Sequence, residues 1–176
     1  NEDKEVNLIE DKILSSNIIL EAFGNAKTLR NDNSSRFGKF IKLFYSNNKI
    51  IGGTVETYLL EQVRIVNHHK QERNYHIFYM LLKSLPTHIK QNLFLKDCKD
   101  YDILNNQYVS RDTDDTIEFT QFEQKMKLFF TNIEIIEIYK LLSVVLLLGN
   151  CKVIKNNQSI EFVNNQEVNE ICDLLQ

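Results

Sequence analysis

The spacing of apolar residues near the start of the chain is that of a helix. Residues 1–7 are mainly polar and charged, and Leu8, Ile9, Ile13 and Leu14 then recur at i, i+1, i+5 and i+6. A second helical stretch is expected from Ile19 to Thr28. We therefore expect helices over 1–30, with 1–7 as a frayed terminus.

Two apolar runs rich in strand-forming residues follow at 40–45 and 50–57. The polar residues 46–49 separate them, which predicts a β-hairpin. Gly52 and Gly53 lie inside the second run, where paired glycines favour a bulge or a bend.

The remainder of the chain is predicted to be mainly helical. Ile77, Phe78, Leu81 and Leu82 predict one apolar face on a helix over 74–84, which ends before Pro86. Further helices are expected over 88–95, 115–129, 133–148 and 166–175, and a small hairpin over 152–154 and 159–163. In the helix over 115–129, the apolar stripe is Phe119, Phe122, Met126 and Phe129.

The helix over 133–148 ends in the apolar run Val144-Val145-Leu146-Leu147-Leu148, so its end is expected to be buried. Glu134, Glu137 and Lys140 shorten the apolar stretch well below the roughly 18 to 20 residues that a membrane span needs. Gly149 is expected to cap the helix at its carboxyl end.

Composition indicates an ordinary globular protein. Hydrophobic residues make up 43% of the 176 residues and charged residues 26%, with a formal net charge of −3. That charge gives no basic surface for nucleic acid or for an acidic membrane. Cys98, Cys151 and Cys172 are widely spaced and odd in number, so we expect reduced thiols in a cytosolic protein. The polar start is not a signal peptide.

Several polar clusters have a structural interpretation that we prefer to a chemical one. His68, His69 and His76 lack zinc-like spacing, so His68 and His69 are expected to be exposed and His76 to be packed. Glu72 and Arg73 are expected to form a charge pair at the start of a helix. The remaining cluster consists of the acids Asp112, Asp114 and Asp115, which fit a helix amino terminus better than a calcium loop.

The stretch from Asn31 to Lys39 has a different character, because three chemistries lie side by side in it. Asparagine amides can donate to phosphate oxygens, the adjacent hydroxyls of Ser34 and Ser35 can bind a hard cation, and Arg36 supplies a fixed positive charge. The stretch joins a predicted helix to a predicted strand, which is a usual place for a phosphate-sensing loop.

These residues resemble the switch I region of the myosin motor domain. Leu20 to Thr28 reads L-E-A-F-G-N-A-K-T and Asn31 to Lys39 reads N-D-N-S-S-R-F-G-K, as in the family pattern. Kinesins share S-S-R but continue differently. A second match is E-R-N-Y-H-I-F-Y at 72–79, and L-L-G-N at 147–150 resembles the family's L-H-L-G-N, with Leu147 in place of histidine.

The resemblance implies a fold: an α/β, helix-rich fragment of the myosin motor, related to the P-loop NTPases. Residues 31–39 would be the switch I loop, 40–57 a hairpin of the central sheet, and 58–148 the helical part of the upper 50 kDa subdomain. Residues 149–176 would hold a small hairpin and a further helix, with 155–158 in loop 4, near actin. The resemblance also implies that residues 1–7 are the end of loop 1, a surface loop of the family. For these seven residues we prefer the alternative interpretation, a frayed terminus.

The resemblance also implies functional roles, all for ATP and Mg²⁺ in an intact motor. Asn31 would hold phosphate oxygens, and Asn33 is a further candidate for the nucleotide. Ser34 would close over the γ-phosphate, Ser35 would bind Mg²⁺, and Arg36 would pair with a glutamate of switch II. Ser34 and Arg36 are the catalytic candidates. The pocket neighbours are Asn25 and Lys39.

Two motifs of such motors do not occur in this sequence: the G-x-x-x-x-G-K-[ST] phosphate loop and the D-x-x-G sequence of switch II. We therefore expect an internal part of a motor head that does not hydrolyse ATP by itself. The implied partners are the rest of the head and the actin filament, without nucleic acid or a membrane span, in the cytoplasm at the cytoskeleton. The alternative is a non-catalytic helical interaction module.

Overall fold

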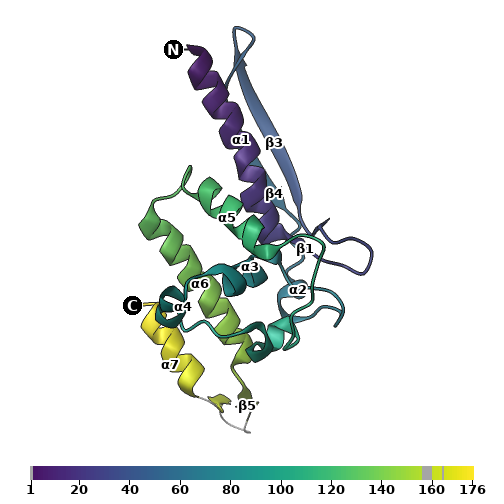
Figure 1. Cartoon of the computed structure of the whole chain (residues 1–176), viewed down its shortest axis with the longest axis vertical. Coiled ribbons are helices and arrows are strands. Elements are labelled where there is room, and N and C mark those ends of the chain that lie inside the picture. Colours follow the sequence, from purple (N-terminus) through teal and green to yellow (C-terminus); the bar gives the residue numbers. More distant parts are fainter. Residues whose placement is uncertain (1, 156–159, 164) are drawn as a thin grey trace.

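A computed structural model describes residues 2–155, 160–163 and 165–176 (Figure 1). Its helices are α1 (Glu2–Gly24), α2 (Val63–Val66), α3 (His76–Ser84), α4 (Thr87–Asn92), α5 (Asp115–Met126), α6 (Asn132–Asn150) and α7 (Asn165–Leu174), with 3-10 turns η1 (Cys98–Asp100) and η2 (Asp102–Leu104). Its strands are β1 (Asn25–Ala26), β2 (Ser34–Ser35), β3 (Gly38–Ser46), β4 (Lys49–Tyr58), β5 (Val153–Lys155) and β6 (Ile160–Phe162). The predicted helix-rich mixture with small antiparallel hairpins is confirmed.

Helix α1 is continuous from Glu2, so the expected frayed start is wrong for residues 2–7. No proline or glycine interrupts the chain before Gly24, and nothing else there breaks the helical hydrogen bonds. The helix ends at Gly24, where an added Cβ would lie 2.3 Å from Cδ1 of Phe37. A glycine is therefore required where the helix meets the chain segment that returns beside it.

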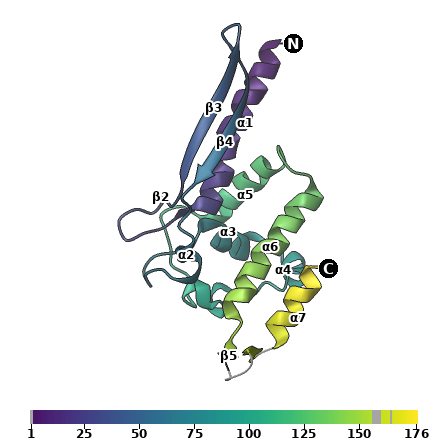
Figure 2. The same cartoon turned by 180° about the vertical axis from the view of Figure 1, so that it is seen from behind.

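The hairpin β3–β4 lies along α1, as both cartoon views show (Figures 1 and 2). Its two-residue turn is Asn47-Asn48, and both residues have positive φ, 49° and 58°. This is the turn geometry that fits the twist of paired strands, and asparagine tolerates it. Phe44 pairs with Gly52 but Tyr45 pairs with Ile50, so the extra residue is Ile51 and the irregularity predicted at the glycines is confirmed.

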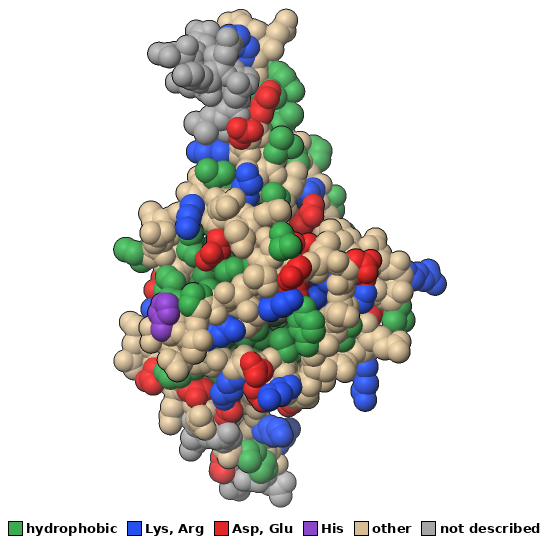
Figure 3. Space-filling model, in the orientation of Figure 1, with side chains coloured by type: hydrophobic (Ala, Val, Ile, Leu, Met, Phe, Trp, Pro, Cys, Tyr) green, Lys and Arg blue, Asp and Glu red, His purple; other side chains and the backbone are tan. Residues whose placement is uncertain are grey.

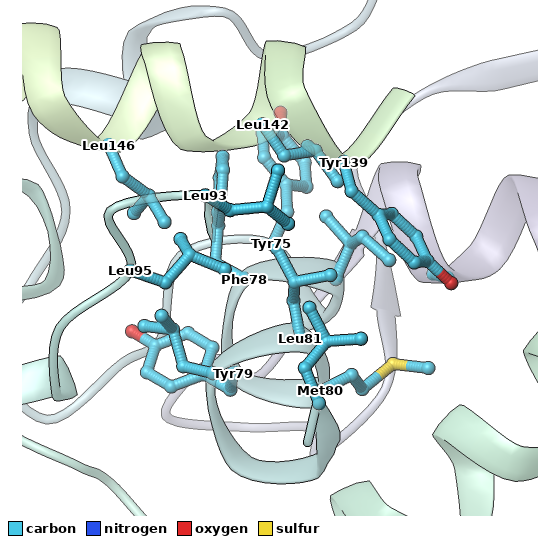
Figure 4. Packing of buried hydrophobic residues seen from close by; sticks show 14 of the residues in the cluster. Tyr75, Phe78, Tyr79, Met80, Leu81, Leu93, Leu95, Tyr139, Leu142 and Leu146 are labelled. Atoms are coloured by element: carbon cyan, nitrogen blue, oxygen red, sulfur yellow. The ribbon is translucent and has the colours of Figure 1, made fainter. Parts of the chain in front are cut away.

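Helix α3 is the centre of the hydrophobic core. We expected one buried face, but every residue from His76 to Leu82 is buried, because α1 and α5 pack around this helix and side chains of α6 face it (Figure 4). Figure 4 shows Phe78 and Leu81 meeting Leu93 and Leu142. The helix ends as predicted: Leu85 is extended before Pro86.

Helices α5 and α6 depart from the predicted apolar pattern at their ends. Phe119, Phe122 and Met126 are buried as expected, but α5 ends at Met126, so Phe129 lies in the following turn and is 41% exposed. In α6, Leu148 is 53% exposed because it lies on the side away from the core, whereas Leu146 and Leu147 are fully buried.

Gly149 lies inside α6 and does not cap it, since the helix continues to Asn150. Its φ is not positive, so it lacks the left-handed conformation of a glycine cap. An added Cβ would lie 2.3 Å from Cγ2 of Ile103. The absence of a side chain therefore lets η2 approach α6.

The carboxyl-terminal part follows the predicted order. Strands β5 and β6 pair antiparallel, with Val153 opposite Phe162, and α7 packs on α6. The expected turn at 156–158 lies outside the described residues. Lys155 is exposed at the end of β5, and its contact with actin stays a prediction.

A buried ion pair joins α5 to the residues before α3. Nη2 of Arg73 lies 2.9 Å from Oδ1 of Asp115, and both side chains are fully buried. Tyr108 donates its hydroxyl to Asp115 at 2.5 Å, and the Arg73 guanidinium lies 3.9 Å from the Tyr79 ring centre. The expected pair of Glu72 with Arg73 is therefore wrong. Burial raises the pKa of Asp115, but the hydrogen bond and charge of Arg73 outweigh it and hold that pKa below its usual value.

Replacing Asp115 by Asn should destabilise the fold by about 3–5 kcal/mol, because it leaves the Arg73 charge buried without a counter-charge. Urea unfolding measures the loss. Asp114→Asn is the matched control: Asp114 is exposed and caps α5, and asparagine also caps helices. Equal losses in the two variants would contradict a special role for the buried pair.

The chain by itself should be poorly soluble or loosely packed. Large apolar side chains reach the surface among the charges in Figure 3, and the hairpin exposes Phe40, Tyr45 and Ile51 by more than half. Unpaired strand edges and apolar surface favour association. Phe40→Thr with Ile51→Thr should raise the soluble fraction after centrifugation, whereas Thr54→Ser should not. A monomeric wild-type chain with a sharp two-state thermal transition would contradict this prediction.

Candidate functional site

The residues that the sequence singled out lie on a loop that we call the polar arm, residues 27–36. Two short strands close its base, with Asn25 opposite Ser35 and Ala26 opposite Ser34. The backbone N–H of Arg36 also donates to the carbonyl of Gly24 at 2.8 Å. Figure 2 shows the arm projecting near α2, between the end of α1 and the start of β3. The helix-to-strand connection was predicted, but the strand pair at its base was not.

Asn31 organises the tip of the arm. Its backbone carbonyl accepts from the N–H of Thr28 at 2.8 Å, and its Oδ1 accepts from the N–H of Asn33 at 2.8 Å. The residue is exposed. Because the amide oxygen is used within the turn, the NH₂ group is the part of Asn31 that can donate to a phosphate.

Asn33 of the arm contacts Asn25 at the base of the arm. The Nδ2 of Asn25 donates to Oδ1 of Asn33 at 3.0 Å, and Nε2 of His76 lies 3.0 Å from the same oxygen. Asn25 and His76 are buried. The carboxamide oxygen of Asn33 is thus bound within the protein, so Asn33 serves the shape of the arm in this structure.

The two hydroxyls differ in exposure. Ser34 is half-buried, and its Oγ accepts from Nη1 of Arg36 at 3.2 Å. Ser35 is exposed, and its Oγ donates to the carbonyl of Phe37 at 2.9 Å. That hydrogen bond uses the Ser35 proton and leaves oxygen lone pairs for a cation, so the residue fits one position of a Mg²⁺ coordination shell.

Arg36 has an acidic partner within this chain, contrary to our expectation that its partner lies elsewhere. Its Nε lies 2.8 Å from Oε2 of Glu61, an ion pair without hydrogen-bond geometry, and both side chains are partly exposed. The N–H of Glu61 donates to the carbonyl of Arg36 at 2.9 Å. Nε of Arg64 lies 2.8 Å from the same carboxylate oxygen.

The charge of Glu61 is stabilised by these two arginines. Burial raises its pKa, but the hydrogen bond from Arg64 and the charges of Arg64 and Arg36 outweigh it and bring the pKa below its usual value. Arg64 also binds Glu72, whose Oε1 accepts from the N–H of Leu29 in the arm. A chain of charges therefore links both sides of the arm to α2. No local pattern in the sequence indicated these ion pairs, because most of their members are far apart along the chain.

Lys39 does not contact the arm. Its Nζ donates to Oδ1 of Asn17 at 2.8 Å and so ties β3 to α1. Instead, Lys27 pairs with Asp32 inside the arm, and Asp32 accepts from the N–H of Asp112 at 2.6 Å. The hydrogen bond from Lys27 lowers the pKa of Asp32. Opposite charges within the short arm were a signal in the sequence that could have identified this pair.

The other histidines make no metal centre in the part of the chain that the structure describes. His68 is half-buried and lies 3.0 Å from Nδ2 of Asn105, so its expected exposure is wrong; the loop after α2 folds against η2. His69 is exposed as predicted. Among the described residues, no helix is long and apolar enough to cross a membrane.

Acid should destabilise the protein through His76. Burial and then the charges of Arg111 and Arg73 lower the pKa of His76 to about 3, against weaker opposing effects of Asp115 and Asp32. Between the ordinary value of 6.5 and 3 the unfolded chain binds the extra proton, so stability falls as pH falls, by at most about 1.4 kcal/mol per pH unit.

Urea unfolding at pH 7, 6 and 5 measures how the free energy of unfolding changes with pH. His76→Gln should reduce this pH dependence, whereas the control His69→Gln, at an exposed histidine, should leave it unchanged. A slope unchanged in His76→Gln would show that other groups cause the acid sensitivity.

Comparison with known proteins identifies the family. The family described as "Myosin head (motor domain)" matches residues 1–176. Myosin-VIIa of Drosophila melanogaster is 45% identical over 175 residues, covering 95% of this chain and 8% of that protein. Myosin-4 of Saccharomyces cerevisiae is 41% identical over 177 residues, 97% of this chain and 12% of that protein.

Myosin type-2 heavy chain 1 of Schizosaccharomyces pombe is 40% identical over 172 residues, which are 95% of this chain and 11% of that protein. The chain spans about a tenth of the length of these relatives. The match over the whole chain includes the polar arm and the buried residues Arg73 to His76. On this evidence the chain belongs to the myosin head (motor domain) family.

Proposed function

We propose that this chain supplies the switch I wall of a nucleotide pocket in an actin-based, ATP-driven motor. The observation that carries the proposal is the polar arm: a loop fixed at its base by strand pairing that presents Asn31 and Ser35 to solvent. Two further points support the proposal: these residues resemble the switch I sequence of myosin motors, and the chain belongs to the myosin head family.

In this proposal each residue of the arm has a role that follows from its chemistry. The NH₂ group of Asn31 donates to phosphate oxygens, and the Ser35 hydroxyl oxygen is a ligand for Mg²⁺. Ser34 closes over the γ-phosphate and helps to place the attacking water. Mg²⁺ bound with ATP neutralises charge on the phosphates. Asn25 and Asn33 support the shape of the arm, since Nδ2 of Asn25 donates to Oδ1 of Asn33 at 3.0 Å.

Arg36 is proposed to exchange partners. In this structure it pairs with Glu61, which also binds Arg64. Because Glu61 keeps Arg64 as a partner when Arg36 leaves, the exchange does not leave the Glu61 carboxylate without a positive charge beside it. In a complete head, a switch II glutamate would take Arg36 when the γ-phosphate is present, and the pocket would close. This exchange is the step that links the phosphate to a movement of the chain.

The proposed division of the chain follows from that assignment. Residues 31–39 form the sensing loop, 40–57 join the central sheet, 58–148 belong to the upper 50 kDa subdomain, and 149–176 include loop 4. The sensing loop runs directly into β3, so a movement of the arm reaches the hairpin through the backbone. The partners are the rest of the head and actin, at the cytoskeleton.

The test uses a motor head that contains this chain. Ser35→Ala and Arg36→Ala should each lower the rate of ATP hydrolysis by about 100-fold or more, because the first removes a ligand of Mg²⁺ and the second removes the partner of the switch II glutamate that closes the pocket. Circular dichroism should show that the fold is kept, because both residues are at least partly exposed. The matched control is Ser46→Ala, an exposed serine at the far end of the hairpin.

Unchanged turnover in both arm variants would contradict the proposed roles. It would favour the alternative, a non-catalytic helical interaction module.

A further inference from the structure

The oxygen of Asn33 is held by two donors from different parts of the fold. Asn25, at the end of α1, donates its Nδ2 from one side, and His76, the first residue of α3, approaches with Nε2 from the other, each at 3.0 Å. His76 is 2% exposed. An oxygen that accepts two hydrogen bonds from buried groups cannot turn away without leaving both donors unsatisfied.

The position of the proton on His76 follows from its neighbours. The Oδ1 of Asn33 can only accept, so Nε2 of His76 must carry the hydrogen. Nη1 of Arg111 lies 3.5 Å from the same nitrogen and can only donate. Arg111 is bound instead by Asp115, at 3.2 Å, and by Glu118. Neutral His76 with its hydrogen on Nε2 therefore fits the contact with Asn33 at 3.0 Å, which is shorter than the contact with Arg111.

The other ring nitrogen, Nδ1, is buried and has no hydrogen-bond partner among the described residues. A histidine kept in the core with one nitrogen unsatisfied needs an explanation, because burial of an unpaired polar atom costs stability. A carbon side chain would fill the same space without that cost. The hydrogen bond of Nε2 to the arm supplies the explanation.

The connection reaches the reactive part of the arm through one covalent step, since Ser34 follows Asn33 directly. Every residue of α3 from His76 to Leu82 is buried, so His76 is a rigid point of attachment. We propose that His76 is a positioning residue that holds the polar arm in its binding shape by donating from Nε2 to Asn33. The effect on nucleotide rests on the proposed function, whereas the effect on the arm does not.

The first part of the test measures the arm without nucleotide, in a motor head that contains this chain. His76→Leu and Asn33→Ala should each speed amide hydrogen exchange in residues 28–35 by about fivefold, the effect of one lost hydrogen bond. The double variant should show no more than either single variant. His76→Gln, whose amide nitrogen can replace Nε2, should restore slow exchange. His88→Leu, at an exposed histidine of α4, is the control.

The rescue by glutamine distinguishes a role of His76 in positioning the arm from a role in packing the core. Leucine and glutamine both fill the space of the histidine, but only glutamine can donate a hydrogen bond to Asn33. Failure of His76→Gln to restore slow exchange, or additive effects of the two single variants, would overturn the proposal. If His76→Leu does not fold, Asn33→Ala and His76→Gln still test it, since the first should loosen the arm and the second should not.

The second part measures ATP hydrolysis in the same variants. His76→Leu should raise KM for Mg-ATP by about the same factor as it speeds exchange, and His76→Gln should restore it. Faster exchange in the arm with KM unchanged would support the positioning role and count against the proposed function. Thus the two proposals fail in different ways.

Discussion

The structure depends on one buried segment, Arg73 to His76, whose polar groups are all in the interior. Arg73 pairs with Asp115 of α5, and its N–H donates to the carbonyl of Lys27 at the base of the arm. Asn74 donates to the carbonyls of Ile65 and Ile103, which fixes α2 and η2. Because burying a polar group without a partner costs stability, the contacts that these four residues make determine where the arm, α2 and α5 meet. The hydrophobic core around α3 then holds the segment in place.

Local patterns in the sequence predicted most elements, because the signals for them are short. The polar residues 46–49 predicted the turn of the hairpin, Gly52 and Gly53 predicted its irregularity, and Pro86 predicted the end of α3. Other features depend on distant residues. Gly149 looked like a cap, yet its small size serves the approach of Ile103. The spacing around Arg73 suggested a pair with Glu72, and only the fold shows that Asp115 is the partner.

In the candidate site, too, some features follow from local sequence patterns and others depend on distant residues. The sequence identified the arm and its chemistry through a resemblance, and the chain's membership of the myosin head family is confirmed. It did not indicate that Glu61 pairs with Arg36 or that His76 binds Asn33, since these contacts bring together residues 25 and 43 positions apart. The arm is thus a short recognisable sequence whose shape is set by groups that carry no local signal.

The central claim is that this arm binds the metal and phosphates of a nucleotide in a complete head. A structure of a motor head that contains this chain, with Mg²⁺ and a non-hydrolysable ATP analogue bound, tests it most directly. The account predicts Oγ of Ser35 at about 2.1 Å from Mg²⁺, with Asn31 donating to a phosphate oxygen. An analogue bound with Ser35 still donating to Phe37, and with the metal held by other residues, would contradict it.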